Sequence, residues 1–311
     1  MNSYDVAVIG GGPAGLSAAL VLTRARRSVL VIDAGRPRNA PAAHVQGFLS
    51  RDGQPPSELL AIGAGEVAAY GGQLARGTVT SVTRAAGGTF EVRFGVGHVL
   101  TARRVLVTTG LQDVLPDVPG VADRWGRDVL HCPYCHGYEV RDQRLGVLGG
   151  TPEAVQHALL VRQWSDDVVF FDHTSTLTPR EREQLTARAI GVVHGPLARL
   201  VVEDDALAGV ELASGQVVER DAAFVRPSFV PNADLLAELG CDVHDTGWVV
   251  ADPTGRTSVP EVWVAGNAAN PRAQVITAAG EGSAAAISIN NDLVEEDVRR
   301  AVHDFRAGLP V

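Results

Sequence analysis

The sequence predicts two three-layer α/β domains, the second of them inserted into the first. Three observations carry this prediction. A short apolar run followed by a glycine-containing turn occurs twice, at residues 6–15 and again at 144–154. Each turn leads into a helical stretch and a second apolar run, which is the pattern of a strand–helix–strand unit in a parallel sheet. An isolated apolar run at 262–266 then predicts a last parallel strand of the first domain.

The first domain opens with one complete strand–helix–strand unit. Further on, Phe90, Val92 and Phe94 alternate with polar residues, which predicts an antiparallel strand with one solvated face. Residues 36–56 are rich in Pro, Ala and Gly and predict a surface loop. The elements expected in chain order are a strand at 6–9, a glycine turn at 10–15, helices at 16–26 and 57–69, and strands at 29–32, 90–94 and 105–110.

The second domain repeats this pattern from residue 115 onward. We expect a strand at 144–148, a turn at 149–151, a helix at 152–164 and a strand at 168–171. A long helix at 275–306 follows the last strand of the chain. The predicted boundaries are 1–114 and 229–311 for the two parts of the first domain, and 115–228 for the insertion.

Composition limits the class of protein. The chain has 311 residues, 45% of them hydrophobic and 20% charged, which suffices for two domains with full cores. The net charge of −9 argues against a nucleic-acid partner, because such partners need a basic face. The N-terminus lacks the basic region of a signal peptide, and no apolar run reaches the roughly 20 residues of a membrane span. We therefore expect a cytoplasmic protein without a membrane partner.

The turn at Gly10–Gly15 has the form of a dinucleotide-binding loop of a Rossmann-like domain. Its glycines allow a tight turn and close approach of a pyrophosphate, and the following helix directs N–H groups at the phosphates. Asp33 ends the next strand, 18 residues after Gly15, where it can accept a hydrogen bond from a ribose hydroxyl. This context predicts that the loop binds a dinucleotide.

Cys132 and Cys135 form a C-x-x-C motif, and Cys241 stands alone. Structural zinc would need four ligands, and the sequence has no second C-x-x-C and no H-x-x-x-H. The string C-x-x-C-H is also used for covalent haem, but Met1 is the only methionine available as an axial ligand. The α/β units on either side favour a redox-active pair. We expect no bound metal, and a buried, inert thiol at Cys241.

His136 directly follows the pair and is the candidate acid–base group. An imidazole with an ordinary pKa of about 6.5 can take a proton from a thiol and return it near neutral pH. A merely structural surface histidine is the alternative. His131, on the other side of the motif, is a weaker candidate.

The second glycine turn departs from the dinucleotide pattern. In the register that starts at Gly149, Thr151 replaces the glycine that would meet a pyrophosphate. Glu153 adds a negative charge at the helix start, where it would repel a phosphate. No arginine before Arg180 could hold the 2′-phosphate of NADPH, whereas Asp172 leaves an NADH site open. We predict a structural remnant, with a working nicotinamide site as the alternative.

Taken together, these motifs resemble the low-molecular-weight thioredoxin reductases over nearly the whole chain. The resemblance covers the glycine loop, the Thr108-Thr109-Gly110 turn, the C-x-x-C in an inserted domain, and the segments 262–267 and 273–282. It implies bound FAD and a homodimer. The cofactor-binding residues that it implies are Gly10, Gly12, Pro13, Ala14, Gly15, Asp33, His44, Val79, Thr109, Gly110, Gly266, Asn267, Gln274 and Val275.

The departures from that family indicate a particular branch of it. His136 replaces the Asp that usually follows the second cysteine, and Asn267 replaces an Asp that usually follows Gly266. The usual NADPH loop and His-Arg-Arg run are missing. Residues 132–139 and 162–167 resemble instead the dithiol oxidases that close the disulfides of gliotoxin and holomycin with oxygen rather than a nicotinamide.

The resemblance therefore implies an FAD-dependent oxidase of a small-molecule dithiol. A substrate thiolate, helped by His136, would attack Cys132, and a second substrate thiol would resolve the mixed disulfide. Cys135 would then pass two electrons to FAD, and oxygen would be reduced to peroxide. The alternative is a disulfide reductase fed by NAD(P)H, ferredoxin or another donor. A non-catalytic flavoprotein that senses redox state is a third hypothesis.

Overall fold

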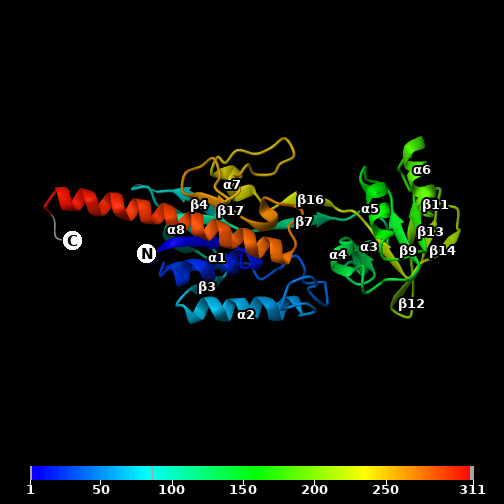
Figure 1. Ribbon diagram of the computed structural model, residues 1–311, viewed down its shortest axis with the longest axis horizontal. Coiled ribbons are helices and arrows are strands. Elements are labelled where there is room, and N and C mark those ends of the chain that lie inside the picture. The colour runs from blue at the N-terminus through cyan, green and yellow to red at the C-terminus, as the bar shows by residue number, and fades with distance from the viewer. Residues whose placement is uncertain (1, 86, 309–311) are drawn as a thin grey trace. The chain divides into compact units, whose positions relative to one another are not determined.

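The computed structural model describes residues 2–85 and 87–308 and divides the chain into two compact units (Figure 1). Unit 1 comprises Met1–Ala40, Pro56–Gln112 and Val230–Val311, and unit 2 comprises Pro41–Pro55 and Asp113–Phe229. The chain passes between the units four times, and two of these passages run along the paired strands β7 (Leu111–Val114) and β16 (Ser228–Pro231).

Unit 1 is built on a seven-stranded sheet, in which six strands have the order β3-β2-β1-β6-β5-β4 and the seventh, β17, also pairs with β6. The long strand β6 pairs with β5 through residues 98–102 and with β17 through 105–107. The strands nearest the centre are apolar on both faces, because helices and irregular segments cover them on both sides. The strands are β1 (Asn2–Ile9), β2 (Val29–Asp33), β3 (Gln73–Arg76), β4 (Val79–Arg84), β5 (Phe90–Phe94), β6 (His98–Val107) and β17 (Val262–Val264).

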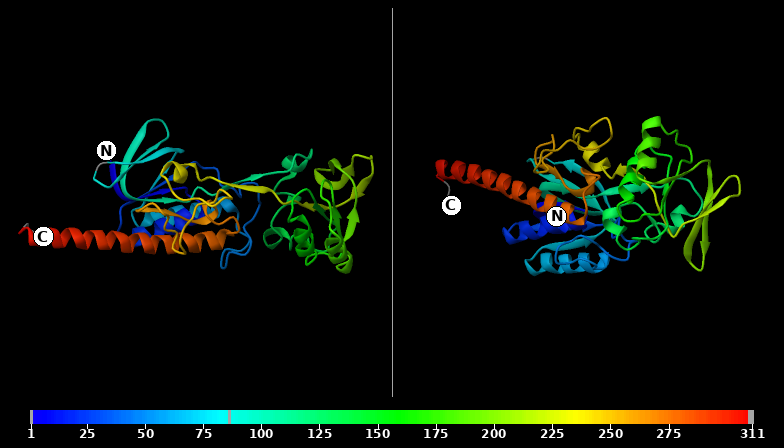
Figure 2. Two further views of the ribbon diagram at one scale, coloured as in Figure 1. Left: turned by 90° about the horizontal axis from the view of Figure 1, so that it is seen from above. Right: turned by 45° about the vertical axis from the view of Figure 1, so that its right-hand side comes forward.

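The helices of unit 1 include the long α8, whose C-terminal part runs past the rest of that unit (Figures 1 and 2). Small residues let α8 lie close to α1: a Cβ added at Gly282 would lie 2.0 Å from the carbonyl oxygen of Ala14. The helices are α1 (Pro13–Arg24), α2 (Pro56–Ala69), α7 (Asp234–Glu238) and α8 (Val275–Arg306), with a 3-10 turn η1 (Gly266–Ala268).

Unit 2 contains a five-stranded parallel sheet of order β11-β10-β9-β15-β8, next to a three-stranded antiparallel sheet of order β12-β13-β14. The parallel strands are β8 (Val129–Leu130), β9 (Leu145–Leu148), β10 (Val168–Phe171), β11 (Gly191–Val193) and β15 (Ala222–Phe224). The antiparallel strands are β12 (Leu197–Glu203), β13 (Ala206–Leu212) and β14 (Val217–Glu219), and the helices are α3 (Val121–Arg124), α4 (Pro133–His136), α5 (Ala154–Val161) and α6 (Pro179–Ala187).

The predicted fold class is confirmed, and several predicted elements need new boundaries. The first helix starts at Pro13 rather than at 16, because the fixed φ of proline suits the first helical position. It ends before Arg26, whose φ of +64° is incompatible with a helix. The helix predicted at 152–164 is only α5, because residues 151–153 form a turn before it. No helix in the described part of the chain is long and apolar enough to cross a membrane.

Candidate functional site

The glycine loop after β1 has the backbone geometry that a pyrophosphate requires. Gly10 has a φ of +109°, and a Cβ on Gly15 would lie 1.9 Å from the carbonyl oxygen of Gly10, so the turn itself demands both glycines. A Cβ on Gly12 would meet nothing within 4 Å. The protein's own packing therefore does not explain Gly12, whereas close approach of a phosphate to the start of α1 does.

Side chains from neighbouring strands brace this loop. Asp33 accepts hydrogen bonds from the N–H groups of Gly11 and Gly35, both at 2.6 Å. Each carboxylate oxygen keeps a further lone pair, so this arrangement is compatible with a ribose contact. The hydroxyl of Thr108 donates to the carbonyl oxygen of Gly10 at 2.8 Å. Sequence reasoning had selected Thr109 from this turn and missed the bracing role of Thr108.

The Thr109–Gly110 turn is tied to a distant residue, Asn232. The Thr109 hydroxyl donates to the carbonyl oxygen of Asn232 at 2.6 Å, and the Asn232 amide donates back to the carbonyl oxygen of Thr109 at 2.9 Å. Gly110 has a φ of +73°, which favours glycine at that position. Nothing in the sequence pointed to Asn232, because it lies 123 residues from its partner.

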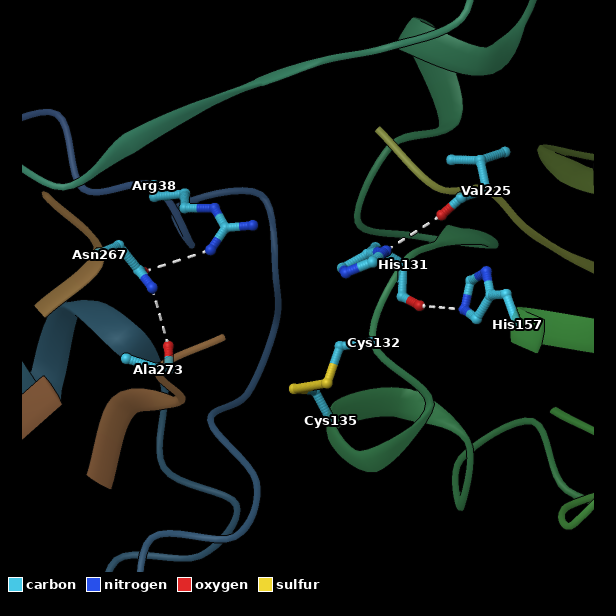
Figure 3. Close-up of a disulfide and its surroundings, with 8 residues drawn as sticks. All are labelled: Arg38, His131, Cys132, Cys135, His157, Val225, Asn267 and Ala273. Atoms are coloured by element: carbon cyan, nitrogen blue, oxygen red, sulfur yellow. Dashed lines mark hydrogen bonds between the residues drawn. A yellow bond between two sulfur atoms is a disulfide. The ribbon is translucent and has the colours of Figure 1, made fainter. Parts of the chain in front are cut away.

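The segment after β17 forms a second polar loop. Glu281 on α8 accepts from the N–H of Gly266 at 3.0 Å and from the side-chain amide of Asn270 at 2.6 Å. The side-chain oxygen of Asn267 accepts from Arg38 at 3.3 Å (Figure 3). Gly266 has a φ of +70°, and a Cβ there would lie 3.0 Å from the Ala14 side chain. Glycine at 266 thus brings this loop against the start of α1.

Most of the predicted cofactor residues gather at one edge of the unit 1 sheet. β1, β2, β6 and β17 are parallel, so the segments that follow their carboxyl ends lie at the same edge. In open α/β sheets, ligands bind at this edge. The residues placed there are Gly10, Gly12, Pro13, Ala14, Gly15, Asp33, Thr109, Gly110, Gly266 and Asn267, with Gln274 and Val275 at the start of α8. These residues fit a bound dinucleotide such as FAD.

Two predicted cofactor residues stand apart. Val79 begins β4, where it packs against the hydrophobic core of unit 1. It follows closely after Gly77, whose N–H donates to the Asp33 carbonyl oxygen at 2.9 Å. His44 is exposed and lies in segment 41–55, which belongs to unit 2. A role of His44 in cofactor binding therefore stays a prediction.

The C-x-x-C motif forms a closed disulfide at the single-turn helix α4 (Figure 3). The Cα atoms of Cys132 and Cys135 are 5.2 Å apart. The carbonyl oxygen of Cys132 accepts from the N–H groups of Cys135 and His136, each at 3.1 Å. Both cysteines are partly exposed, as a pair that reacts with an external thiol requires.

Trp164 supports this redox turn from outside the motif. A Cβ on Gly137 would lie 2.8 Å from the Trp164 indole, so glycine at 137 is needed for the close contact. The Tyr134 ring meets the same indole edge-on, with centroids 5.5 Å apart. Tyr134 and Tyr138 are themselves exposed beside the disulfide turn. The segment 162–167, singled out in the sequence, thus contributes a packing residue to the site.

His136 has the properties of a neutral proton acceptor. Burial lowers its pKa below the ordinary value, and the nearby Glu139 carboxylate opposes that shift only in part. The ring of His136 makes no hydrogen bond to any other residue within 2–85 and 87–308. A neutral imidazole with a free ring nitrogen can take a proton from an incoming thiol.

The second glycine turn already uses its polar groups internally. The N–H of Gly150 donates to the Ser175 hydroxyl at 2.8 Å. Asp172, the candidate ribose acceptor, receives the N–H of Gly195 at 3.0 Å and lies 2.6 Å from His194 Nδ1. Glu153, at the start of α5, lies 3.6 Å from Arg226. The Glu153 carboxylate therefore pairs within the protein at the point where a pyrophosphate would bind.

The third cysteine is buried, as predicted. Cys241 is 6% exposed, and its sulfur lies 3.5 Å from the Thr257 hydroxyl. Burial raises the pKa of its thiol, which keeps the sulfur protonated and unreactive. Over the described residues, no cluster of three or more His, Cys, Asp or Glu side chains is arranged to hold a metal ion.

Comparison with known proteins identifies the family. Residues 4–282 match the pyridine nucleotide-disulphide oxidoreductase family. Thioredoxin reductase sirT from Leptosphaeria maculans is 32% identical, over 95% of this chain and 96% of that protein. The crystal structure of HlmI superposes with a TM-score of 0.96 at 56% identity, over 98% and 97% of the two chains. An oxidoreductase from Agrobacterium tumefaciens gives a TM-score of 0.88 at 34% identity, over 94% and 99%.

The predicted resemblance to thioredoxin reductases is therefore confirmed, together with FAD as cofactor and oxidoreduction as activity. The match extends across the glycine loop, the disulfide turn and the start of α8, so it includes every segment described above as part of the site. The chain belongs to the pyridine nucleotide-disulphide oxidoreductase family, as a thioredoxin-reductase-like flavin disulfide oxidoreductase.

Proposed function

We propose that this protein oxidises a small-molecule dithiol to an intramolecular disulfide and uses oxygen as the electron acceptor. One contrast carries the proposal. The disulfide turn and the first glycine loop keep the groups that their chemistry needs, whereas the second glycine turn pairs its polar groups internally. In balanced form, one dithiol and one O2 give one disulfide and one H2O2.

The proposed roles follow from position and chemistry. Neutral His136 accepts the proton of a substrate thiol, and the resulting thiolate attacks Cys132 and releases Cys135 as a thiolate. The second substrate thiol attacks the sulfur of the mixed disulfide that belongs to the substrate, which releases the product and leaves Cys132 reduced. FAD, when bound, would accept the electron pair that Cys132 and Cys135 give up when their disulfide re-forms.

We also propose a role for each of the two units. Unit 1 is the FAD domain, and the residues that follow the carboxyl ends of its parallel strands bind the cofactor. Unit 2 carries the redox pair on a scaffold that descends from a nicotinamide-binding domain. Two observations support loss of NADPH binding: Thr151 in place of glycine, and the pairing of Glu153 with Arg226.

We further propose a cytoplasmic homodimer. Exposed apolar residues recur on one face of α8 at helical spacing, at Val294, Val298, Val302 and Phe305. The C-terminal part of α8 runs past the rest of unit 1 (Figure 2). A helix with such an apolar stripe gains stability when a second copy covers it.

Aerobic turnover of a simple dithiol tests the proposal. Purified FAD-loaded protein is mixed with dihydrolipoamide or dithiothreitol in air, and H2O2 and disulfide are both followed. We expect the two products in equal amounts, and loss of turnover in Cys132→Ser and Cys135→Ser, with Cys241→Ser as the matched control that stays active.

Anaerobic flavin titration provides the opposing outcome. We expect dithiol to bleach the flavin absorbance and NADPH or NADH to leave it unchanged over the same time. Rapid bleaching by NADPH, without peroxide from any dithiol tested, would reverse the assignment in favour of a disulfide reductase.

A further inference from the structure

A buried histidine outside the redox motif is bonded to it. His157 lies on α5 and is 5% exposed. Its Nε2 is 2.8 Å from the main-chain carbonyl oxygen of His131, the residue before Cys132 (Figure 3). Because a carbonyl oxygen only accepts hydrogen bonds, Nε2 carries the proton in this contact. The bond therefore links the core helix α5 to the start of the disulfide turn.

The surroundings of His157 keep this donor in place. Its Nδ1 is buried and has no hydrogen-bond partner among the described residues. The ring meets Phe224 edge-on, with centroids 5.9 Å apart. Burial lowers the pKa of His157 to about 3, and the neighbouring His131 and Arg226 further disfavour a positive charge. The imidazole is thus neutral near physiological pH, with its single proton committed to the His131 carbonyl.

His131 is fixed from a second side. Its Nδ1 lies 3.2 Å from the carbonyl oxygen of Val225, directly after β15, and its ring meets Phe229 edge-on at 5.2 Å. The main chain of His131 is therefore held by α5 and its side chain by the segment after β15. Both anchors act on the residue whose peptide bond leads into Cys132.

We propose that His157 is a positioning residue that holds Cys132 in place for disulfide closure, a role that rests on the redox function proposed above. Closing the ring requires the Cys132 and Cys135 sulfurs to approach each other. A constraint on the main chain before Cys132 raises their effective concentration, so it favours the disulfide over the dithiol. His157 touches neither sulfur directly and acts through the His131–Cys132 peptide.

The test measures the thiol–disulfide equilibrium of the protein itself. FAD-loaded wild type, His157→Phe and His157→Gln are equilibrated anaerobically in dithiothreitol redox buffers, and the reduced fraction is determined by alkylation and mass spectrometry. Each protein disulfide reduced leaves one oxidised dithiothreitol, and each FAD reduced leaves one more, so flavin absorbance is recorded in the same samples to count the two couples separately. Oxygen takes no part in this exchange, so the result does not depend on which acceptor the enzyme uses.

We expect His157→Phe to shift the equilibrium constant toward the dithiol by up to about tenfold, which corresponds to about 30 mV for a two-electron couple. His157→Gln, whose side-chain amide places an N–H near the position of Nε2, should stay within about twofold of wild type. If the phenylalanine variant does not fold, His157→Asn, whose shorter amide falls short of that position, replaces it in the comparison.

The proposal is overturned if the variants without the donor lose thermal stability or FAD but keep the wild-type equilibrium constant, because His157 would then be purely structural. The proposal is also overturned if His157→Gln shifts the thiol–disulfide equilibrium constant as far as His157→Phe does. A failure of dithiol oxidation in air, with the expected equilibrium shift intact, would count against the proposed function and not against this role.

Discussion

The side-chain amide of Asn267 donates to the main-chain carbonyl oxygen of Ala273 at 3.0 Å. The same nitrogen donates to the carbonyl oxygen of Asn270 at 2.9 Å. These two bonds hold together the loop between η1 and α8, next to the glycine loop of the FAD site. A carboxylate has no hydrogen to donate, so an aspartate could not make either contact.

We therefore predict that Asn267→Asp weakens FAD binding, although aspartate is the usual residue of the thioredoxin reductases. The variant loses two hydrogen bonds of about 1 kcal/mol each and places a negative charge beside two carbonyl oxygens. The FAD-to-protein ratio after gel filtration should fall well below that of wild type. Asn291→Asp, on the exposed face of α8, is the matched control. Equal FAD content in Asn267→Asp and wild type would contradict this account of the loop.

Gly12 should be needed for the cofactor and not for the fold. A Cβ at 12 meets no protein atom within 4 Å, so Gly12→Ala should lose FAD, while its FAD-free form should unfold at nearly the temperature of FAD-free wild type. Gly65→Ala on α2 is the control, since its Cβ also meets nothing. That variant should keep FAD and gain up to about 1 kcal/mol of helix stability. Full FAD retention in Gly12→Ala would argue against a pyrophosphate at this loop.

The pH dependence of dithiol oxidation should report His136. Its pKa lies below the ordinary 6.5, so the imidazole stays neutral and able to accept a proton down to pH values below 6.5. The acid limb of kcat/KM should therefore fall below pH 6.5 and vanish in His136→Gln, with a rate loss of about 100-fold. An unchanged acid limb in that variant would assign the proton transfer to another group.

His157 should make the protein less stable in mild acid. Its pKa is about 3 in the folded state against 6.5 as the ordinary value, so between these pH values the unfolded chain binds more protons. The free energy of unfolding should thus rise with pH through this window. Above pH 6.5 the effect of His157 on it should be constant, because the histidine is then neutral in the unfolded chain too. The slope should be smaller in His157→Gln, by at most about 1.4 kcal/mol per pH unit. Urea unfolding at pH 4 to 7 measures the slope of the unfolding free energy against pH. Identical slopes in wild type and His157→Gln would contradict a buried, neutral His157.

A buried ion pair network beneath α8 should dominate the electrostatic part of unit 1 stability. Arg104 is 2% exposed and contacts Asp292 at 2.6 Å and Glu296 at 2.8 Å. Arg104→Met leaves these carboxylates without that partner, so we expect a loss of about 3 kcal/mol in urea unfolding. Arg299→Ala removes only an exposed pair with Glu295 and should cost less than about 0.5 kcal/mol. Equal losses in both variants would show that the buried pairs of Arg104 contribute no more to stability than the exposed pair of Arg299.

Local sequence was sufficient wherever a feature is completed within a short stretch of chain. The glycine loop with Asp33 lies inside one strand–helix–strand unit, and Cys132–His136 occupy a single turn, so neighbouring residues alone indicated their chemistry. Strands such as β3, β12 and β14 were not predicted. They are short and partly exposed, and their pairing with distant strands, rather than an apolar pattern of their own, makes them strands.

The sequence by itself determined the class of chemistry: a dinucleotide loop, a redox pair with a histidine beside it, and a second loop that had lost its glycine. Only the tertiary structure decided how individual polar groups are used. Asn232 meets Thr109 across 123 residues, and His157 meets the His131 carbonyl across 26. Asn232 reaches Thr109 because β16 pairs with β7, and His157 reaches His131 because the segments that follow parallel strands of one sheet lie at the same edge. The order of residues along the chain does not encode either proximity in a local pattern.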